Sequence, residues 1–174
     1  VGSLAPQYCI EEMLYFFSKI KEKFTSAKFL VLSGNHHYFL QKLKKYEELR
    51  KDIILKSLES KDVGKYLSSC DLGLAIRRKS FSMQAVAPIK LGEYLMCGLP
   101  VIATSEIGDT YMINNNNGYL LHNNSKEEID LALEWFHSNY LKLRKNSKDI
   151  EAIGKNYFSL DSSVKKYLDV LRKI

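Results

Sequence analysis

The sequence predicts an α/β fold, a Rossmann-like doubly wound parallel sheet followed by C-terminal helices. Short apolar runs typical of strands alternate with amphipathic helical patterns through most of the 174 residues. Helical patterns alone then fill residues 125–174. Because this length suits one domain with its own core, we expect a single Rossmann-like domain over 1–174 whose helical tail is 125–174.

Five apolar runs are expected to form the strands. They are AKFLVLSGN (27–35), a weaker run KDIILKS (51–57), DLGLAI (71–76), LPVIATS (99–105) and NGYLLH (117–122). Continuous rather than alternating apolar runs suit strands that are buried on both faces of a parallel sheet. We therefore expect a parallel sheet of five or six strands joined by right-handed crossovers.

Helical patterns occupy the intervals. The first has one apolar stripe, formed by Ile10, Met13, Leu14, Phe17 and Ile20. Further helices are expected over 60–70 and 88–98. The tail begins with a capping box, Ser125 and Glu128. It should continue with two more helices, and the last carries a stripe of Val164, Tyr167, Leu168, Leu171 and Ile174.

Composition excludes several classes of protein. With 45% hydrophobic and 26% charged residues, the chain is typical of a globular protein. The net charge of +6 comes from basic residues that are spread along the chain and mixed with acidic ones, so solvated helix faces are favoured and no nucleic-acid partner is expected. No apolar run approaches the roughly 20 residues of a membrane-spanning helix. The opening VGSLAPQY, without an initiating Met, reads as the end of a strand entering a loop, and suggests a piece of a longer protein.

Cysteines and histidines give no sign of a metal site. Cys9, Cys70 and Cys97 lie in apolar sequence without the spacing of metal ligands. Buried thiols in a reducing compartment, and hence a cytoplasmic location, are expected. His36 and His37 are adjacent but have no cluster of Cys or carboxylates beside them, so we expect no metal.

The stretch APIKLGEYLMCGLPVIATSEIGD (87–109) carries the clearest functional pattern. Pro88 is suited to the first helical position and Gly98 to a left-handed cap, which predicts a helix over 88–97. Its amino end should lie at the carboxyl ends of the strands, where free N–H groups of Ile89 and Lys90, the helix dipole and the Lys90 side chain would bind an anion. Glu93, the only acid in this helix, could then accept hydrogen bonds from ribose hydroxyls. The alternative is that Glu93 simply pairs with Lys90 on the helix surface.

Residues 88–104, PIKLGEYLMCGLPVIAT, resemble a segment of the C-terminal, nucleotide-sugar-binding domain of GT-B glycosyltransferases. The opening VGSLAPQYCIEEML and the run CDLGLAI resemble other parts of that domain. The resemblance implies a retaining, metal-independent transferase of hexosyl type, with a nucleotide-diphosphate sugar as substrate and no cofactor. It also implies that Glu93 holds the ribose, that Ile89 and Lys90 face the diphosphate, and that Gly2 and Ser3 lie near the phosphates.

The same resemblance implies partners. The acceptor, a glycan or a lipid-linked sugar, would bind a missing N-terminal domain of the same enzyme, to which the last helix crosses back. Polysaccharide biosynthesis in the cytoplasm, with peripheral membrane contact by the full-length protein, would suit such an enzyme. The isolated domain is expected to be inactive.

Three departures from the family pattern stand out. Ala85 occupies the position where many members carry a second glutamate that contacts the donor sugar, and the first loop lacks the usual Arg and Lys. Arg77, followed by Arg78 and Lys79, could supply that charge, although three adjacent cations also suit a solvated loop. Gly108 fits the turn that many relatives have after 88–104, whereas Asp109 has no evident role.

Other functions remain open. A non-catalytic nucleotide-binding or interaction module could keep this fold, and a sugar-nucleotide epimerase shares the two-domain architecture. The chain has no Walker loop, no Gly-x-Ser-x-Gly and no Gly-x-Gly-x-x-Gly. ATPase, hydrolase and dehydrogenase functions are therefore disfavoured.

Overall fold

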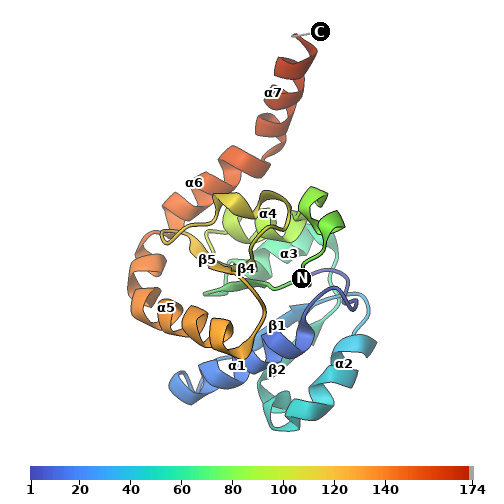
Figure 1. Ribbon diagram of the computed structural model, residues 1–174, viewed down its shortest axis with the longest axis vertical. Coiled ribbons are helices and arrows are strands. Elements are labelled where there is room, and N and C mark those ends of the chain that lie inside the picture. Colours follow the sequence, from blue (N-terminus) through green and yellow to red (C-terminus); the bar gives the residue numbers. More distant parts are fainter. Residues whose placement is uncertain (173–174) are drawn as a thin grey trace.

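The five strands of the chain all pair in parallel (Figure 1). The computed structural model describes residues 1–172. Strand β1 (Phe29–Leu32) pairs with β2 (Ile53–Lys56), and β4 (Val101–Thr104) pairs with β3 (Gly73–Ala75) on one side and β5 (Gly118–Leu121) on the other. Each strand lies within one of the five predicted apolar runs, so the expected α/β fold with parallel strands is confirmed.

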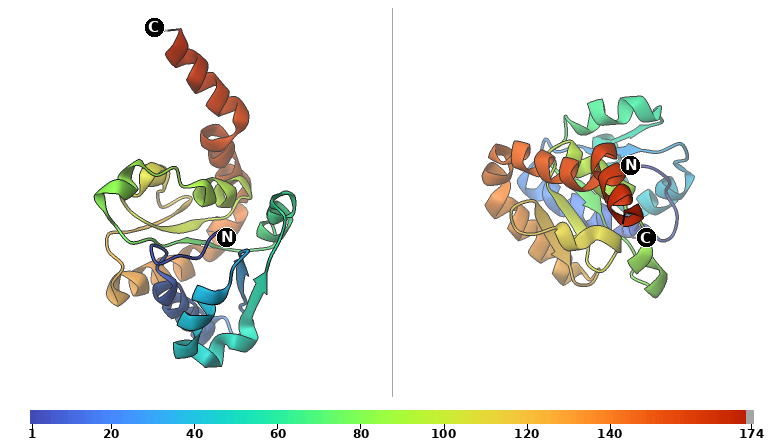
Figure 2. Two further views of the ribbon diagram at one scale, coloured as in Figure 1. Left: turned by 90° about the vertical axis from the view of Figure 1, so that its right-hand side faces the viewer. Right: turned by 90° about the horizontal axis from the view of Figure 1, so that it is seen from above.

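The prediction of one continuous sheet is wrong for this chain. The strands form a two-stranded sheet, β1-β2, and a three-stranded sheet, β3-β4-β5. The backbone at the amino end of the chain lies between the two sheets (Figures 1 and 2). The Gly2 N–H donates a hydrogen bond to Leu32 O of β1 at 2.8 Å.

Helices connect the strands and cover them. In chain order they are α1 (Ile10–Lys23), α2 (His37–Leu43), η1 (Lys44–Asp52), α3 (Ser60–Leu67), η2 (Phe81–Ala85), α4 (Ile89–Met96), η3 (Gly108–Met112), α5 (Lys126–Lys145), α6 (Ser147–Phe158) and α7 (Leu160–Leu171), where η denotes a 3-10 helix. The predicted helices over 60–70 and 88–98 are α3 and α4, and the three helices of the tail are α5, α6 and α7. His37 begins a helix, α2, that the strand-and-turn pattern of this region did not predict.

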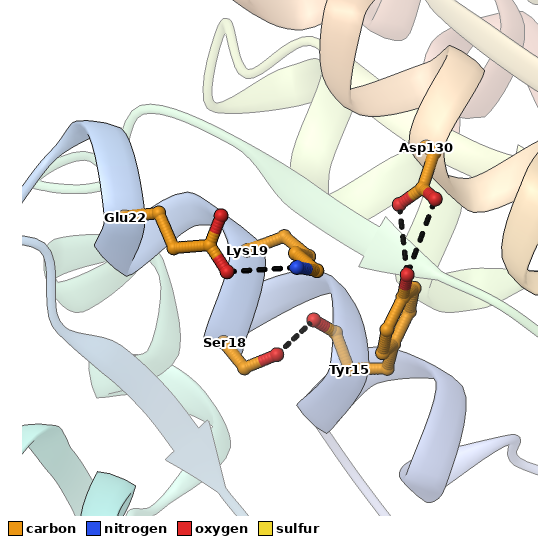
Figure 3. Close-up of polar contacts among 5 residues, drawn as sticks. All are labelled: Tyr15, Ser18, Lys19, Glu22 and Asp130. Atoms are coloured by element: carbon orange, nitrogen blue, oxygen red, sulfur yellow. Dashed lines mark hydrogen bonds and ion pairs between the residues drawn. The ribbon is translucent and has the colours of Figure 1, made fainter.

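Strand β4 is the centre of the core, because all four of its residues are fully buried. The predicted stripe of α1 is buried as well, and α1 packs against α5. At that contact the Tyr15 hydroxyl donates to both carboxylate oxygens of Asp130, at 3.0 and 3.2 Å (Figure 3). Within α1, Lys19 forms an ion pair with Glu22 at 2.8 Å (Figure 3).

Helix α5 begins with half of the expected capping box. The Ser125 side chain accepts a hydrogen bond from the Glu128 N–H at 3.3 Å. The Glu128 carboxylate instead accepts from the His122 N–H at 3.1 Å, which ties α5 to the end of β5.

The last two tail helices differ in how they pack. Helix α6 packs closely on α4, whereas α7 has no buried residue and projects from the body of the molecule (Figure 2). The predicted stripe members Val164, Tyr167, Leu168 and Leu171 are all exposed, and Ile174 lies outside the described residues.

Two remaining predictions concern thiols and membranes. Cys9 is buried and Cys70 and Cys97 are half-buried, all three as free thiols. Burial raises the pKa of the Cys9 thiol to about 11. Within residues 1–172 no helix has the length and apolar character needed to cross a bilayer.

Candidate functional site

Several predicted site residues meet at the carboxyl ends of the strands. From β3 the chain passes through Arg77 and η2 into α4, so the amino end of α4 lies at this edge of the sheet. The first loop reaches the same edge, because Gly2 is bonded to Leu32, the last residue of β1. The site is thus built from the first loop, the segment after β3, and the start of α4.

The amino end of α4 differs in detail from the prediction. The helix runs from Ile89 to Met96, so Pro88 is the capping residue rather than the first helical one, and Gly98 has the expected positive φ of 72°. The Ile89 N–H donates to Ala87 O at 3.0 Å and is not free for a ligand, which corrects the prediction for that group. The Lys90 N–H has no acceptor among residues 1–172, and no side chain caps the helix.

Lys90 turns back from α4 onto the first loop. Its Nζ donates to Ser3 O at 3.3 Å and lies 3.5 Å from the centroid of the Tyr8 ring. A Cβ at Gly2, whose φ is +87°, would lie 2.8 Å from Lys90 Cε, so only glycine fits there without a shift of the lysine. Burial lowers the pKa of the Lys90 ammonium, against an opposing contribution from Tyr8. Gly2, Ser3 and Lys90 are therefore brought together at the amino end of α4.

Arg77 reaches the same aromatic ring from the other segment. Its guanidinium Cζ lies 4.6 Å from the Tyr8 centroid, and its Nη2 donates to the Tyr8 hydroxyl at 2.6 Å. The Arg77 Nη1 is buried and has no hydrogen-bond partner within residues 1–172. A buried guanidinium nitrogen without an acceptor is costly, so an acceptor that reached Nη1 would relieve this cost.

The backbone of Arg77 is held by two polar side chains that the sequence analysis did not single out. Its N–H donates to Thr104 Oγ1 at 3.0 Å, and Asn124 Nδ2 donates to its carbonyl at 2.8 Å. Thr104 and Asn124 also bond to each other at 3.0 Å. This network distinguishes Arg77 from its neighbours, since Arg78 is exposed and Lys79 pairs with Glu106 at 3.3 Å. The solvated-loop alternative therefore describes Arg78 but not Arg77.

Tyr8 is the site residue that sequence reasoning missed. It forms an isolated antiparallel bridge with Arg77, and its ring contacts both cations. Burial alone would raise the pKa of its hydroxyl, but the nearby Lys90 and Arg77 lower it below the usual value. No motif marks a tyrosine just before a helix, and only the fold brings residue 8 beside residue 77.

Glu93 is half-buried on α4, one turn beyond Lys90. No ion pair or hydrogen bond of its carboxylate occurs within residues 1–172. The alternative of a Glu93–Lys90 surface pair is not observed, because the Lys90 ammonium bonds to Ser3 instead. The carboxylate thus remains free to accept hydrogen bonds from a ligand.

The departures from the family pattern lie beside this site. Ala85 is exposed at the end of η2 and supplies no polar side chain. Gly108 has a φ of 50°, and a Cβ there would collide with the carbonyl of Val86, so this glycine lets the turn after β4 approach the segment before α4. Nothing in the structure explains Asp109. Within residues 1–172 no three metal-ligating side chains come together.

Comparison with known proteins identifies the fold. The family model described as glycosyl transferases group 1 matches residues 1–154. No curated protein matches the chain. Among solved structures, the pneumococcal O-GlcNAc transferase GtfA, in complex with UDP and GlcNAc, is 16% identical with a TM-score of 0.75, over 99% of this chain and 34% of GtfA.

Two further structures are similar. The Anabaena protein Alr3699/HepE, in complex with UDP, is 14% identical with a TM-score of 0.72, over 99% of this chain and 48% of that protein. A mutant of S. aureus TarM, in complex with Fondaparinux, alpha-GlcNAc-glycerol and UDP, is 16% identical with a TM-score of 0.73, over 97% of this chain and 34% of TarM. The chain thus spans between a third and a half of the length of these proteins.

The family match and the fold agree with the resemblance seen in residues 88–104. The match covers the first loop, Arg77 and all of α4. The structures with the same fold are GT-B glycosyltransferases. The chain belongs to the group 1 glycosyl transferases.

Proposed function

We propose that this chain is the donor-binding domain of a glycosyltransferase that uses a nucleotide-diphosphate sugar. The observation that carries this proposal is the arrangement of Arg77 and Lys90 on the Tyr8 ring, beside the amino end of α4. Two cations and a helix amino end at the carboxyl edge of a parallel sheet are suited to a diphosphate.

Arg77 takes the role of the basic residues that the first loop lacks. Its Nη1 is a buried donor in need of an acceptor, and a guanidinium can give two parallel hydrogen bonds to a phosphate. Lys90 adds a point charge and, through its N–H, a backbone donor. With two protein cations on the diphosphate, the reaction would need no divalent ion, so we propose metal-independent transfer.

Glu93 holds the ribose in this proposal. Its carboxylate is not engaged by any cation within residues 1–172, and it lies one helical turn from Lys90. One carboxylate can accept hydrogen bonds from both ribose hydroxyls. That GtfA and HepE were solved in complex with UDP supports a ribonucleotide diphosphate as the ligand class.

The remaining properties concern the intact enzyme. We propose a transfer of hexosyl type to a glycan or lipid-linked acceptor, in the biosynthesis of a polysaccharide in the cytoplasm. The N-terminal domain of the same enzyme would bind the acceptor, and the full-length protein would contact the membrane peripherally. This chain covers only 34% of the length of GtfA and 48% of the length of HepE, which supports a second domain in the intact enzyme.

A second candidate function is a nucleotide-binding module without catalysis. Ala85 favours it, because the side chain at this position gives the donor sugar no polar contact. In that case the nucleotide diphosphate would bind as tightly as its sugar conjugate.

The test is calorimetric titration of the chain with UDP, GDP and ADP and with a hexose conjugate of each. We expect the chain to bind the nucleotide of only one of these three bases. The Arg77→Met variant should bind that nucleotide at least tenfold more weakly than the parent. Lys79→Met is the matched control, because Lys79 is the neighbouring cation that pairs with Glu106, and it should leave binding unchanged. Equal affinity for the free nucleotide and all its sugar conjugates would favour the non-catalytic module, and no binding of any nucleotide would refute both functions.

A further inference from the structure

Glu106 is the one exposed residue in the buried run from Gly98 to Ile107, at the carboxyl end of the central strand β4. Its φ of 62° is the only positive φ of a residue other than glycine within residues 1–172. This left-handed conformation is strained for a residue with a Cβ, whereas glycine adopts it without that cost. Strain of this kind at the edge of a ligand site is typical of a residue with a functional role.

The backbone on both sides of Glu106 is held in place. Before it, the Ser105 N–H donates to Leu121 O of β5 at 2.9 Å. After it, the Ile107 N–H donates to Thr110 Oγ1 at 3.2 Å, and the Ile107 side chain is buried. The left-handed turn at Glu106 therefore carries its side chain out of the core and into solvent.

An ion pair joins Glu106 to the segment after β3. Its carboxylate lies 3.3 Å from Lys79 Nζ, and 68% of the Glu106 side chain stays exposed. Lys79 follows Arg77 by two residues, and the Arg77 N–H donates to Thr104 Oγ1 at the end of β4. An ion pair this exposed adds little stability, so it does not account for the strain, and it leaves the carboxylate open to a ligand.

The same loop also touches the segment that leads into α4. A Cβ at Gly108 would collide with Val86 O and would lie 3.1 Å from Pro88 Cδ. Val86 follows η2, and Pro88 caps the amino end of α4. The loop that carries Glu106 thus contacts both the segment of Arg77 and the residues just before α4, the two elements that provide the cations of the proposed diphosphate site.

We propose that Glu106 binds hydroxyl groups of the transferred sugar and favours a neutral hexose over a hexuronate. This inference rests on the proposed function, in which the diphosphate lies on Arg77 and Lys90 and the ribose on Glu93. The sugar is then at the other end of the diphosphate from the ribose, where Glu106 offers an exposed carboxylate. A carboxylate is an acceptor only, so it can take hydrogen bonds from two neighbouring hydroxyls and would repel a second carboxylate.

The experiment separates the sugar from the nucleotide by calorimetry. The probes are UDP, GDP and ADP with their glucose, galactose and mannose conjugates, and the uronate that matches the tightest conjugate. The quantity compared is the Kd of the conjugate divided by the Kd of the free nucleotide. The proteins are the parent, Glu106→Gln, and Asp109→Asn, which removes a half-buried carboxylate from the same loop and is the matched control.

We expect Glu106→Gln to leave the Kd of the free nucleotide unchanged and to raise the ratio at least tenfold, because charge-assisted hydrogen bonds are lost. Asp109→Asn should change neither quantity. The parent should bind the uronate at least tenfold more weakly than the hexose conjugate, and Glu106→Gln should narrow that difference.

A third variant, Glu106→Gly, removes the strain together with the carboxylate. It should raise Tm by about 2–4 °C while losing the sugar contact as Glu106→Gln does, which a purely structural residue would not produce. A Glu106→Gly protein less stable than the parent would make Glu106 structural and overturn the inference.

The binding outcomes distinguish this inference from the proposed function. An unchanged ratio in Glu106→Gln, or an equal rise in Asp109→Asn, with nucleotide binding intact, would overturn the role of Glu106 alone. If the parent binds no nucleotide, the proposed function and the role of Glu106 are refuted together.

Discussion

Glu93 is a half-buried carboxylate that no cation within residues 1–172 engages, although Lys90 is three positions away on the same helix. Glu93→Gln keeps the shape of the side chain but removes the charge. If the carboxylate accepts hydrogen bonds from ribose, the loss is about 1.5–3 kcal/mol, or roughly ten- to hundredfold in affinity for the nucleotide diphosphate. Calorimetry measures this directly.

Two controls sharpen the Glu93 prediction. Glu134→Gln on the exposed face of α5 should leave affinity unchanged. The 2′-deoxynucleotide should bind the parent more weakly than the ribonucleotide, whereas Glu93→Gln should bind the two alike. Equal binding of the ribonucleotide by parent and variant would make Glu93 a structural residue.

Tyr8 sets the positions of two cations through its ring. Tyr8→Leu removes cation–π contacts that are each worth about 0.5–2 kcal/mol, so affinity for the diphosphate should fall roughly 2- to 30-fold. Tyr8→Phe keeps the ring, loses only the hydrogen bond from Arg77, and should bind with an intermediate affinity. Tyr167→Leu on the exposed α7 is the matched control. If Tyr8→Leu binds as the parent does, the ring does not organise the site.

At the scale of elements, Asp52 joins α1 to the segments that precede β1 and β2. Its carboxylate pairs with Lys21 of α1 at 2.9 Å and with Lys28 at 2.7 Å. Hydrogen bonds from Lys28 and Lys21 lower the pKa of Asp52 to about 2. The unfolded value is about 3.9, so the stabilisation is complete above about pH 4 and is lost as the pH falls towards 2.

Urea unfolding of the parent and of Asp52→Asn from pH 7 to pH 2 tests this link. The parent should be the more stable protein at pH 7, and the difference should close between about pH 4 and pH 2. A difference that stays constant over this range would show that the ion pairs do not stabilise the fold.

Two glycines make an internal comparison of helix packing. A Cβ at Gly154 of α6 would lie 2.5 Å from Met96 N and 2.6 Å from Leu95 C, both backbone atoms of α4. Gly154→Ala should therefore lower the free energy of unfolding by about 1–3 kcal/mol. Gly64 of α3 has nothing within 4 Å of its Cβ position, so Gly64→Ala should instead stabilise by about 0.5–1 kcal/mol through helix propensity.

Denaturant unfolding of both variants decides the point. The opposite signs are the essential result, since both substitutions add the same methyl group to a helix. A Gly154→Ala protein as stable as the parent would mean that α4 and α6 can separate without cost, and that the support of α4 comes from the strands alone.

For the whole molecule, the sequence predicted what depends on local pattern. Each strand was found in its apolar run, and α4 was placed between Pro88 and Gly98, because backbone restrictions at these two residues act within one helix. Resemblance to a family implied that Lys90 and the first loop both face a diphosphate, and this shared role stays a prediction. The helix at His37 was missed, because its seven residues form no clear apolar stripe.

Side-chain contacts between distant segments could not be predicted from the sequence. Tyr8 and Arg77 are 69 residues apart, and neither belongs to a repeating pattern. Thr104 and Asn124 act through hydrogen bonds to the Arg77 backbone, which follow from the order of strands rather than from residue spacing. The division of the strands into two sheets was not predicted, because five strand-like runs do not reveal which strands pair with one another.

The last prediction concerns the proposal that this chain is one domain of a larger enzyme. Transfer requires an acceptor held within reach of the anomeric carbon, and such alignment can lower a barrier by several kcal/mol. In this chain α7 exposes a contiguous apolar surface, formed by Leu160, Val164, Tyr167, Leu168, Val170 and Leu171. A surface of this kind on a projecting helix is typical of one that another domain covers.

We therefore expect the isolated chain to bind a donor sugar but to transfer it at no measurable rate, and the chain joined to an N-terminal domain to be active. In the joined protein, Leu168→Asp and Leu171→Asp should loosen the contact of α7 and reduce transfer. In the isolated chain they should leave donor affinity unchanged, because α7 has no buried residue and projects from the body of the molecule (Figure 2). Assays of donor hydrolysis and transfer for both forms make the comparison. Robust transfer by the isolated chain would show that it is a complete enzyme and that α7 has another role.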